Sequence, residues 1–149
     1  MGLEKQIQQD LKAAMLAKDT TALTSIRGIR AAIQLAKTAP GASGELTDAD
    51  IVKIIQRLVK QRKESAAIYT EQSRPELAEA ELAEAAIMEK YLPEQLSEEE
   101  VEEALKKIIA QVGAKSPADM GKVMGVATKA LAGQADGRLI STIVRRLLS

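Results

Sequence analysis

The sequence contains no cysteine, histidine, phenylalanine or tryptophan, and its only aromatic residues are Tyr69 and Tyr91. Without cysteine and histidine, the chain has no disulfide, no thiol nucleophile and no zinc site of the usual nitrogen and sulfur kind. The side chain that enzymes most often use as a general base near neutral pH is also missing. The scarcity of aromatic residues argues against a β-sandwich and removes the base-stacking surfaces of many single-strand binders. Any catalysis would depend on carboxylates, lysine, hydroxyl groups or tyrosine.

Long hydrophobic runs are absent too. No apolar stretch approaches the roughly 18–20 residues that cross a membrane, and the N-terminal segment lacks the apolar core of a signal peptide. We therefore expect a cytoplasmic protein without a membrane partner. The 149 residues are 46% hydrophobic and 28% charged, as is ordinary for a soluble globular protein, with room for one domain or two small ones.

The formal net charge is zero, but the charges are segregated along the chain. Residues 1–63 carry a net charge of +5, residues 64–103 a net charge of −11, and residues 104–149 a net charge of +6. An acidic middle between two basic ends suits a partner of mixed charge, or contact between the blocks themselves.

Apolar residues recur at three- and four-residue spacing along nearly the whole chain, and no segment alternates with the period of a strand. This pattern predicts an all-α fold of about seven helices, near residues 3–18, 22–37, 47–72, 76–91, 97–112, 117–132 and 137–148. A boundary near residues 93–97 predicts an N-terminal four-helix domain over residues 1–95 and a C-terminal three-helix bundle over residues 96–149.

The sixth predicted helix has clear start and stop signals. Ser116 is placed to cap it, Pro117 suits its first position, and Asp119 approximates the second half of a capping box. Gly133 is placed to stop it, and Asp136 to cap the helix that follows. We therefore expect the two aspartates to serve as helix caps and not as catalytic residues.

Two glycines, Gly121 and Gly125, lie inside this helix, where each costs roughly 1 kcal/mol relative to alanine. We expect them to mark a flat face where another backbone of the fold comes close, so that Gly125→Leu would destabilise by overpacking. The rival interpretation is close approach of an RNA backbone.

Two sets of cations are candidates for binding phosphate groups. The first follows one face of the third predicted helix, and the second lies on the last two helices, where Lys122 and Lys129, and likewise Arg138 and Arg145, are seven residues apart. The alternative for both sets is a solvated face, or ion pairs with the glutamates of residues 76–103. The candidate RNA-binding residues are Lys53, Arg57, Lys60, Lys63, Lys122, Lys129, Arg138, Arg145 and Arg146.

Four stretches, taken in order, resemble the YqeY family, which is related to the tail of one component of the tRNA-dependent amidotransferase (the GatB/YqeY domain). They are Lys60 to Ser65, Tyr91 to Ser97, Ser116 to Gly125, and Gly133-Gln134-Ala135-Asp136-Gly137. The resemblance spans nearly the whole chain and implies an all-helical fold of two parts. The sequence departs from it at Gln72 to Leu77, where the family often has Ala-Gly-Arg before an acidic residue and leucine. Here the glycine is missing and Pro75 is present, which puts the shape of this turn in question.

In the amidotransferase this tail is associated with holding tRNA while other domains do the chemistry. The resemblance thus implies an accessory tRNA-binding protein, with an amidotransferase or synthetase component as a further partner and with no catalytic residue, cofactor or metal of its own. A carbon–nitrogen ligase label, with glutamine as amido donor, would be inherited from the larger enzyme. The alternative is a protein–protein adaptor that uses the acidic middle and the small-residue helix face.

Overall fold

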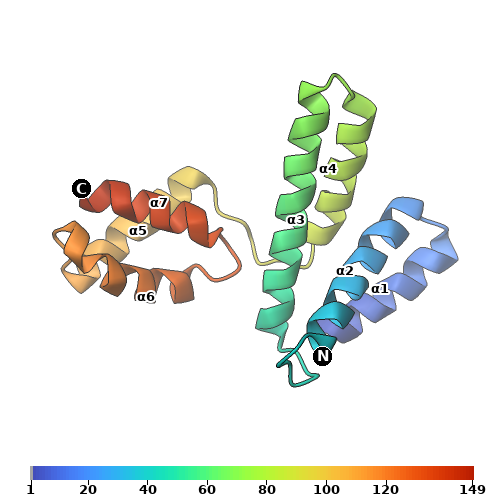
Figure 1. Ribbon diagram of the computed structural model, residues 1–149, viewed down its shortest axis with the longest axis horizontal. Coiled ribbons are helices and arrows are strands. Elements are labelled where there is room, and N and C mark those ends of the chain that lie inside the picture. The colour runs from blue at the N-terminus through green and yellow to red at the C-terminus, as the bar shows by residue number, and fades with distance from the viewer. Residues whose placement is uncertain (1) are drawn as a thin grey trace. The chain divides into compact units, whose positions relative to one another are not determined.

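The computed structural model describes residues 2–149, and over this range the backbone forms seven α-helices, one 3-10 turn and no β-strand. The prediction of an all-α fold is confirmed. In chain order the elements are α1 (Leu3–Ala17), α2 (Thr20–Thr38), α3 (Asp48–Glu71), α4 (Pro75–Glu89), α5 (Glu98–Val112), η1 (Pro117–Asp119), α6 (Met120–Ala130) and α7 (Gly137–Leu148) (Figure 1).

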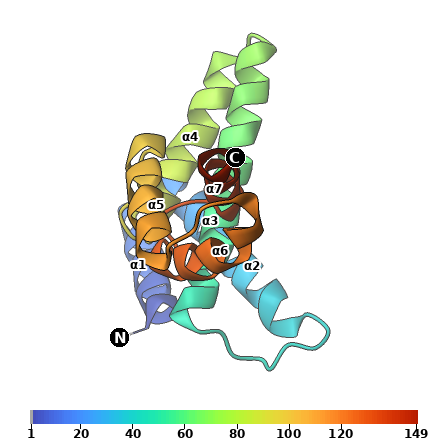
Figure 2. The ribbon, with the colours of Figure 1, turned by 90° about the vertical axis from the view of Figure 1, so that its left-hand side faces the viewer.

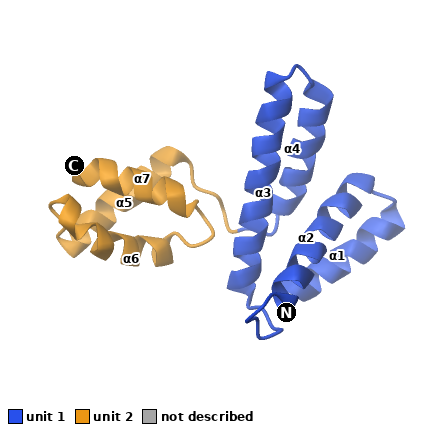
Figure 3. Cartoon of the chain, viewed as in Figure 1, with its two compact units in different colours: residues 1–92 blue, residues 93–149 orange. Residues whose placement is uncertain are grey.

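The chain divides into two compact units, residues 1–92 and residues 93–149 (Figure 3). Each unit has a separate cluster of buried apolar side chains. Unit 1 contains α1 to α4, and unit 2 contains α5, η1, α6 and α7.

Unit 1 consists of two helical hairpins, α1 with α2 and α3 with α4, and α2 packs against both helices of the second hairpin. Branched aliphatic residues fill the space between them, because the apolar side of each helix faces inward. The largest fully buried side chains of this core are Ile7, Ile29, Ile51, Ile55 and Met88.

Polar contacts attach α1 to the second hairpin. The backbone N–H of Leu3 donates to Asp48 Oδ1 at 3.0 Å, where α3 begins. The hydroxyl of Tyr91, just after α4, donates to Asp10 Oδ2 at 2.5 Å. Burial, and then this hydrogen bond to Asp10, raise the pKa of Tyr91 above its usual value. The tyrosine of the Tyr-Leu-Pro stretch therefore fastens the end of α4 to the middle of α1.

A partly buried ion pair joins α3 to α4. Arg62 Nε lies 3.5 Å from Glu84 Oε1. This contact is an ion pair and not a hydrogen bond, and the described residues provide no hydrogen-bond acceptor for this buried nitrogen. Gly28 of α2 makes room for the guanidinium, since a Cβ at this position would lie 3.3 Å from Arg62 Nη2. The pair thus sits where three helices meet.

The far part of the second hairpin, residues 64–84, projects past α1 and α2 in both views of unit 1 (Figures 1 and 2), and we call it the arm. The core shared by the four helices ends at Val59 on α3 and Ala85 on α4. Beyond that point the two helices pack on each other through small residues, with Ala66 and Ala78 both buried. At the turn between the helices, Ser73 has φ +58°, in the left-handed region that residues other than glycine seldom adopt.

Unit 2 is a three-helix bundle in which α5, α6 and α7 contact one another. Its fully buried side chains include Val101, Leu105, Val123, Ile143 and Val144. The incoming chain is held to the loop between α6 and α7. Here the N–H of Leu96 donates to the carbonyl of Gln134 at 3.0 Å, and the side-chain amide of Gln95 donates to the carbonyl of Gly133 at 2.6 Å.

Two helices begin with complete capping boxes. Asp50 accepts from the backbone N–H of Thr47 at the start of α3, and Glu100 accepts from that of Ser97 at the start of α5. The N–H of Thr47, followed by its hydroxyl, holds the pKa of Asp50 below the usual 3.8. The N–H and then the hydroxyl of Ser97 hold the pKa of Glu100 below the usual 4.5 in the same way.

We expect residues 93–149, made as a fragment, to fold without unit 1, because its apolar core is complete within those residues. Circular dichroism should show a helical spectrum and a single cooperative melting transition. A broad, non-cooperative loss of helix would show that unit 2 depends on the rest of the chain.

The two capping carboxylates predict how stability depends on pH. Because their pKa values are lower in the folded state than in the unfolded state, their contribution is present above about pH 5 and is lost as the pH falls through the folded pKa values. In urea titrations, Asp50→Asn with Glu100→Gln should make the acid-induced loss of stability shallower. Glu45→Gln with Glu94→Gln removes the same charge outside the helices and should change the slope less. Equal slopes for both double variants would contradict the capping explanation.

Candidate nucleic-acid interface

All nine cations predicted to bind RNA are exposed in the structure. They form two sets, which we describe separately because they lie in different units. The α3 basic stripe comprises Lys53, Arg57, Lys60 and Lys63, and the C-terminal basic set comprises Lys122, Lys129, Arg138, Arg145 and Arg146.

On α6, the helical repeat separates the lysines from the core. Val123 and Ala127 are fully buried against the other helices of unit 2. Lys122 and Lys129, two turns apart, are both exposed, and no ion pair to either of them is found among the described residues. These two lysines are therefore available to an anionic partner.

On α7, Ile140, Ile143 and Val144 are buried, and the arginines occupy the exposed side. Arg138 and Arg145 lie two turns apart, as their spacing predicts. Arg146 is already engaged, since its Nη2 donates to Glu102 Oε1 of α5 at 3.0 Å. An exposed pair of this kind contributes little to stability, so a phosphate group could compete for Arg146.

The α3 basic stripe is partly used inside unit 1. Lys63 Nζ lies 2.6 Å from Glu89 Oε1 of α4, which is one of the glutamates that the sequence offered as an alternative partner. The stripe thus combines exposed charge with an internal ion pair, whereas the described residues form no ion pair with the lysines of α6, of which Lys122 is also attracted to Asp119.

The start of the sixth helix differs from the prediction. Pro117–Asp119 forms a 3-10 turn after Ser116, and the α-helix begins only at Met120. Asp119 accepts from the backbone N–H of Lys115 at 2.9 Å and from that of Ser116 at 3.3 Å. The first of these bonds is the main reason that the pKa of Asp119 is lowered. Asp119 therefore caps this turn, but the tight turn shortens the α-helix that follows.

The end of the same helix also differs. α6 ends at Ala130, so Gly133 does not stop it directly and instead takes φ +78° within the loop that follows. Asp136 occupies the N-cap of α7, where its Oδ1 accepts from the N–H of Arg138 at 3.1 Å, and Gly137 is the first helical residue.

The interpretation of Gly121 and Gly125 as residues of close packing within the fold is wrong. Both are exposed, and a Cβ built at either position would meet no atom within 4 Å. They lie beside Lys122 and Lys129 on the outer side of α6. Periodicity placed both glycines on a helix correctly, but it could not show which side of that helix faces the core.

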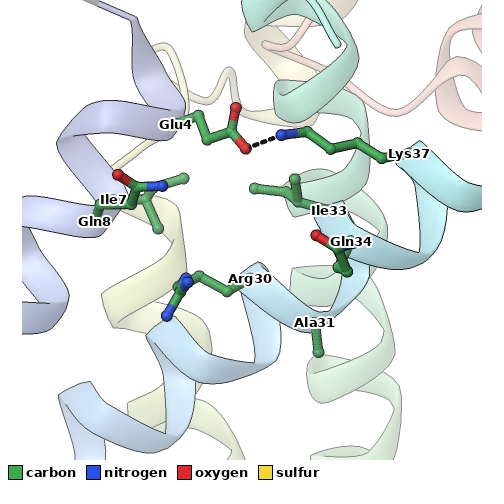
Figure 4. Close-up of a pocket in the computed structure, with 8 residues that line it drawn as sticks. All are labelled: Glu4, Ile7, Gln8, Arg30, Ala31, Ile33, Gln34 and Lys37. Atoms are coloured by element: carbon green, nitrogen blue, oxygen red, sulfur yellow. Dashed lines mark hydrogen bonds and ion pairs between the residues drawn. The ribbon is translucent and has the colours of Figure 1, made fainter. Parts of the chain in front are cut away.

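Unit 1 contains a polar hollow of about 320 Å³ between α1 and α2 (Figure 4). The sequence alone did not indicate that residues of these two helices line a common hollow. Ile7 and Ile33 lie at its floor, and an ion pair between Glu4 and Lys37 bridges the two helices at one end. The residues that line it are Glu4, Ile7, Gln8, Arg30, Ala31, Ile33, Gln34 and Lys37.

Among residues 2–149, no group of acidic side chains is arranged to hold a metal ion. In the same range, no helix is both long enough and apolar enough to cross a membrane.

Comparison with known proteins gives one family. The family model described as Yqey-like protein matches residues 4–148. The E-type subunit of glutamyl-tRNA(Gln) amidotransferase from Thermococcus gammatolerans is 45% identical over 98 residues, which cover 63% of this chain and 14% of that protein. The altered inheritance of mitochondria protein 41 of Clavispora lusitaniae is 36% identical over 114 residues, which cover 75% of this chain and 65% of that protein.

The protein of the same name from Kluyveromyces lactis is 36% identical over 73 residues, which cover 49% of this chain and 39% of that protein. The chain thus spans less than two thirds of the length of the curated relatives it matches.

The corrected environment of the glycines predicts a gain in stability. Gly125→Ala, inside an exposed helix with open space around the new methyl group, should raise the free energy of unfolding by up to about 1 kcal/mol in urea titration. The same change at Gly28 of α2 is the matched comparison and should gain less, because its Cβ would press on the guanidinium of Arg62. Destabilisation by Gly125→Ala would mean that this face is packed after all.

Proposed function

Because the chain belongs to the Yqey-like protein family, we propose that it is an accessory protein of tRNA-dependent amidation that binds tRNA and has no catalytic site of its own. The observation that carries the proposal is the 45% identity to a region of an amidotransferase component whose name specifies glutamyl-tRNA(Gln). The matched region is a small part of that protein. In this proposal, the chemistry belongs to an amidotransferase or synthetase component that acts with the chain.

The arrangement of charge in unit 2 supports RNA as the ligand. Lys122, Lys129, Arg138 and Arg145 are exposed on two neighbouring helices, and the sequence from residue 104 onward has a net charge of +6. Lysine and arginine bind phosphate groups without regard to base sequence. Gly121 and Gly125 add no side chains beside the two lysines, which leaves room for a sugar–phosphate backbone to come close to α6.

The proposed mode of binding is recognition of RNA shape and backbone. Stacking of bases on aromatic rings is the common alternative. Unit 2 contains no aromatic residue, and Tyr91 of unit 1 is partly buried, packed against the core of that unit. A complex held by phosphate contacts weakens steeply as salt concentration rises, because binding releases counterions from the RNA.

The test is the salt dependence of binding to unfractionated tRNA, measured by fluorescence anisotropy or filter binding from about 50 mM salt upward. Lys122→Ala with Lys129→Ala should weaken binding and reduce the slope of log affinity against log salt by roughly one to two units. The fold should survive, since exposed substitutions usually change stability by no more than about 0.5 kcal/mol each.

Two further variants sharpen the result. Lys5→Ala with Lys12→Ala removes the same charge from exposed positions of α1 and should leave the slope unchanged. Lys53→Ala with Arg57→Ala tests the α3 basic stripe, and a loss confined to this variant would move the site to unit 1. If the parent protein shows no salt-dependent binding of tRNA, the proposed function is wrong and an adaptor role replaces it.

A further inference from the structure

The hollow between α1 and α2 is lined by polar side chains at regular helical spacing (Figure 4). Glu4 and Gln8 are one turn apart on α1. On α2, Arg30, Gln34 and Lys37 follow one another at single turns. Because the two helices form a hairpin, the two rows of side chains line a common space of about 320 Å³.

The lining of the hollow has a surplus of one positive charge. It includes two cations, Arg30 and Lys37, and one carboxylate, Glu4. The ion pair with Glu4 neutralises Lys37 at one end of the hollow. No ion pair to Arg30 is found between residues 2 and 149, and in Figure 4 its side chain extends from α2 toward α1. Arg30 is therefore the cation of this lining that can receive an anionic group.

The charge of the hollow favours a ligand with a single negative charge. A guanidinium binds a carboxylate through two parallel hydrogen bonds, which fix the position of the carboxylate as well as pairing its charge. A carboxylate has one negative charge at neutral pH and so matches the surplus. A phosphate monoester carries roughly −1.5 to −2 at that pH and would bring the additional charge close to Glu4. A carboxylate therefore suits this site better than a phosphate.

The remainder of the lining suits hydroxyl groups. The side-chain amides of Gln8 and Gln34 extend from opposite helices, and each offers both donors and an acceptor. Neither amide makes a hydrogen bond to another residue in the described part of the chain. Ile7 and Ile33, at the floor, are already buried by the protein, so a ligand gains little by placing hydrocarbon on them. Hydroxyl groups, which are likewise both donors and acceptors, complement the two amides.

We propose that this hollow binds a small hydroxylated monocarboxylate of the sugar-acid class. The carboxylate of the ligand pairs with Arg30, and its hydroxyl groups bond to Gln8 and Gln34. A volume of about 320 Å³ lies at the lower end of the range for small-molecule sites and accommodates a molecule of this size. None of these residues belongs to the candidate nucleic-acid interface, so the proposal goes beyond the binding of tRNA and does not depend on it.

Three six-carbon probes separate the parts of the proposal. Gluconate has both the carboxylate and the hydroxyl groups, glucitol has the hydroxyl groups without the charge, and hexanoate has the charge without the hydroxyl groups. The full chain, labelled with ¹⁵N, is titrated with each probe at neutral pH and about 50 mM salt, where screening is modest. We expect gluconate to give saturable shifts of amide signals in α1 and α2 at millimolar concentration. It should bind at least about tenfold more tightly than either control.

Two variants change the charge of the hollow in opposite directions. Arg30→Gln removes the receiving cation and should weaken the binding of gluconate by at least about fivefold. Glu4→Gln removes the competing carboxylate and frees Lys37, so it should strengthen binding by about two- to fivefold. Arg27→Gln is the matched control, because it removes an exposed arginine of α2 that does not line the hollow. This control should change the affinity by less than about twofold.

Several results would overturn the proposal. Gluconate could shift no amide of α1 or α2 at millimolar concentration, either control probe could bind as tightly, or Arg30→Gln could bind gluconate as well as Arg27→Gln does. Inorganic phosphate is a further probe, and tighter binding of phosphate than of gluconate in the same hollow would refute a carboxylate ligand. A loss of tRNA affinity in Arg30→Gln that is absent from Arg27→Gln would assign the hollow to the RNA surface and refute a small-molecule site.

Discussion

The packing of α3 on α4 is the interaction on which unit 1 depends. These two helices provide one wall of the four-helix core, and α1 and α2 close that core from the other side. Arg62 and Glu84 form an ion pair between the two helices at the level where α2 contributes Gly28. Farther along, the buried residues of the two helices are the alanines Ala66 and Ala78. The same two helices thus belong to the four-helix core at one end and extend beyond that core at the other.

Periodicity and capping signals predict most of this fold because helix formation is local. Thr47 and Ser97 begin α3 and α5 at the positions that their side chains favour, and Gly113 ends α5 with φ +71°. The contacts that fix the tertiary arrangement are not local. Tyr91 and Asp10 are separated by 81 residues, and Lys37 and Glu4 by 33, so nothing in the sequence pairs them.

The candidate interface was predicted in part for the same reason. Spacing alone places Lys122 with Lys129, and Arg138 with Arg145, on the exposed sides of their helices. It could not show that Arg146 meets Glu102 or that Lys63 meets Glu89, since both pairs form between helices. The glycines were misjudged because a small residue inside a helix suits a crowded surface and an open one equally, and only the neighbouring atoms distinguish the two.

The location of the two tyrosines has a consequence for spectroscopy. Tyr69 and Tyr91 both belong to unit 1, and unit 2 contains no aromatic ring. The intrinsic fluorescence and near-ultraviolet dichroism of the protein therefore originate entirely in its N-terminal unit. Tyr91 donates to a carboxylate of α1, so its emission reports directly on whether α1 remains attached to the end of α4. Unit 2 is optically silent in this range, so the tyrosine signals of the intact chain follow the unfolding of unit 1 alone, without a dye.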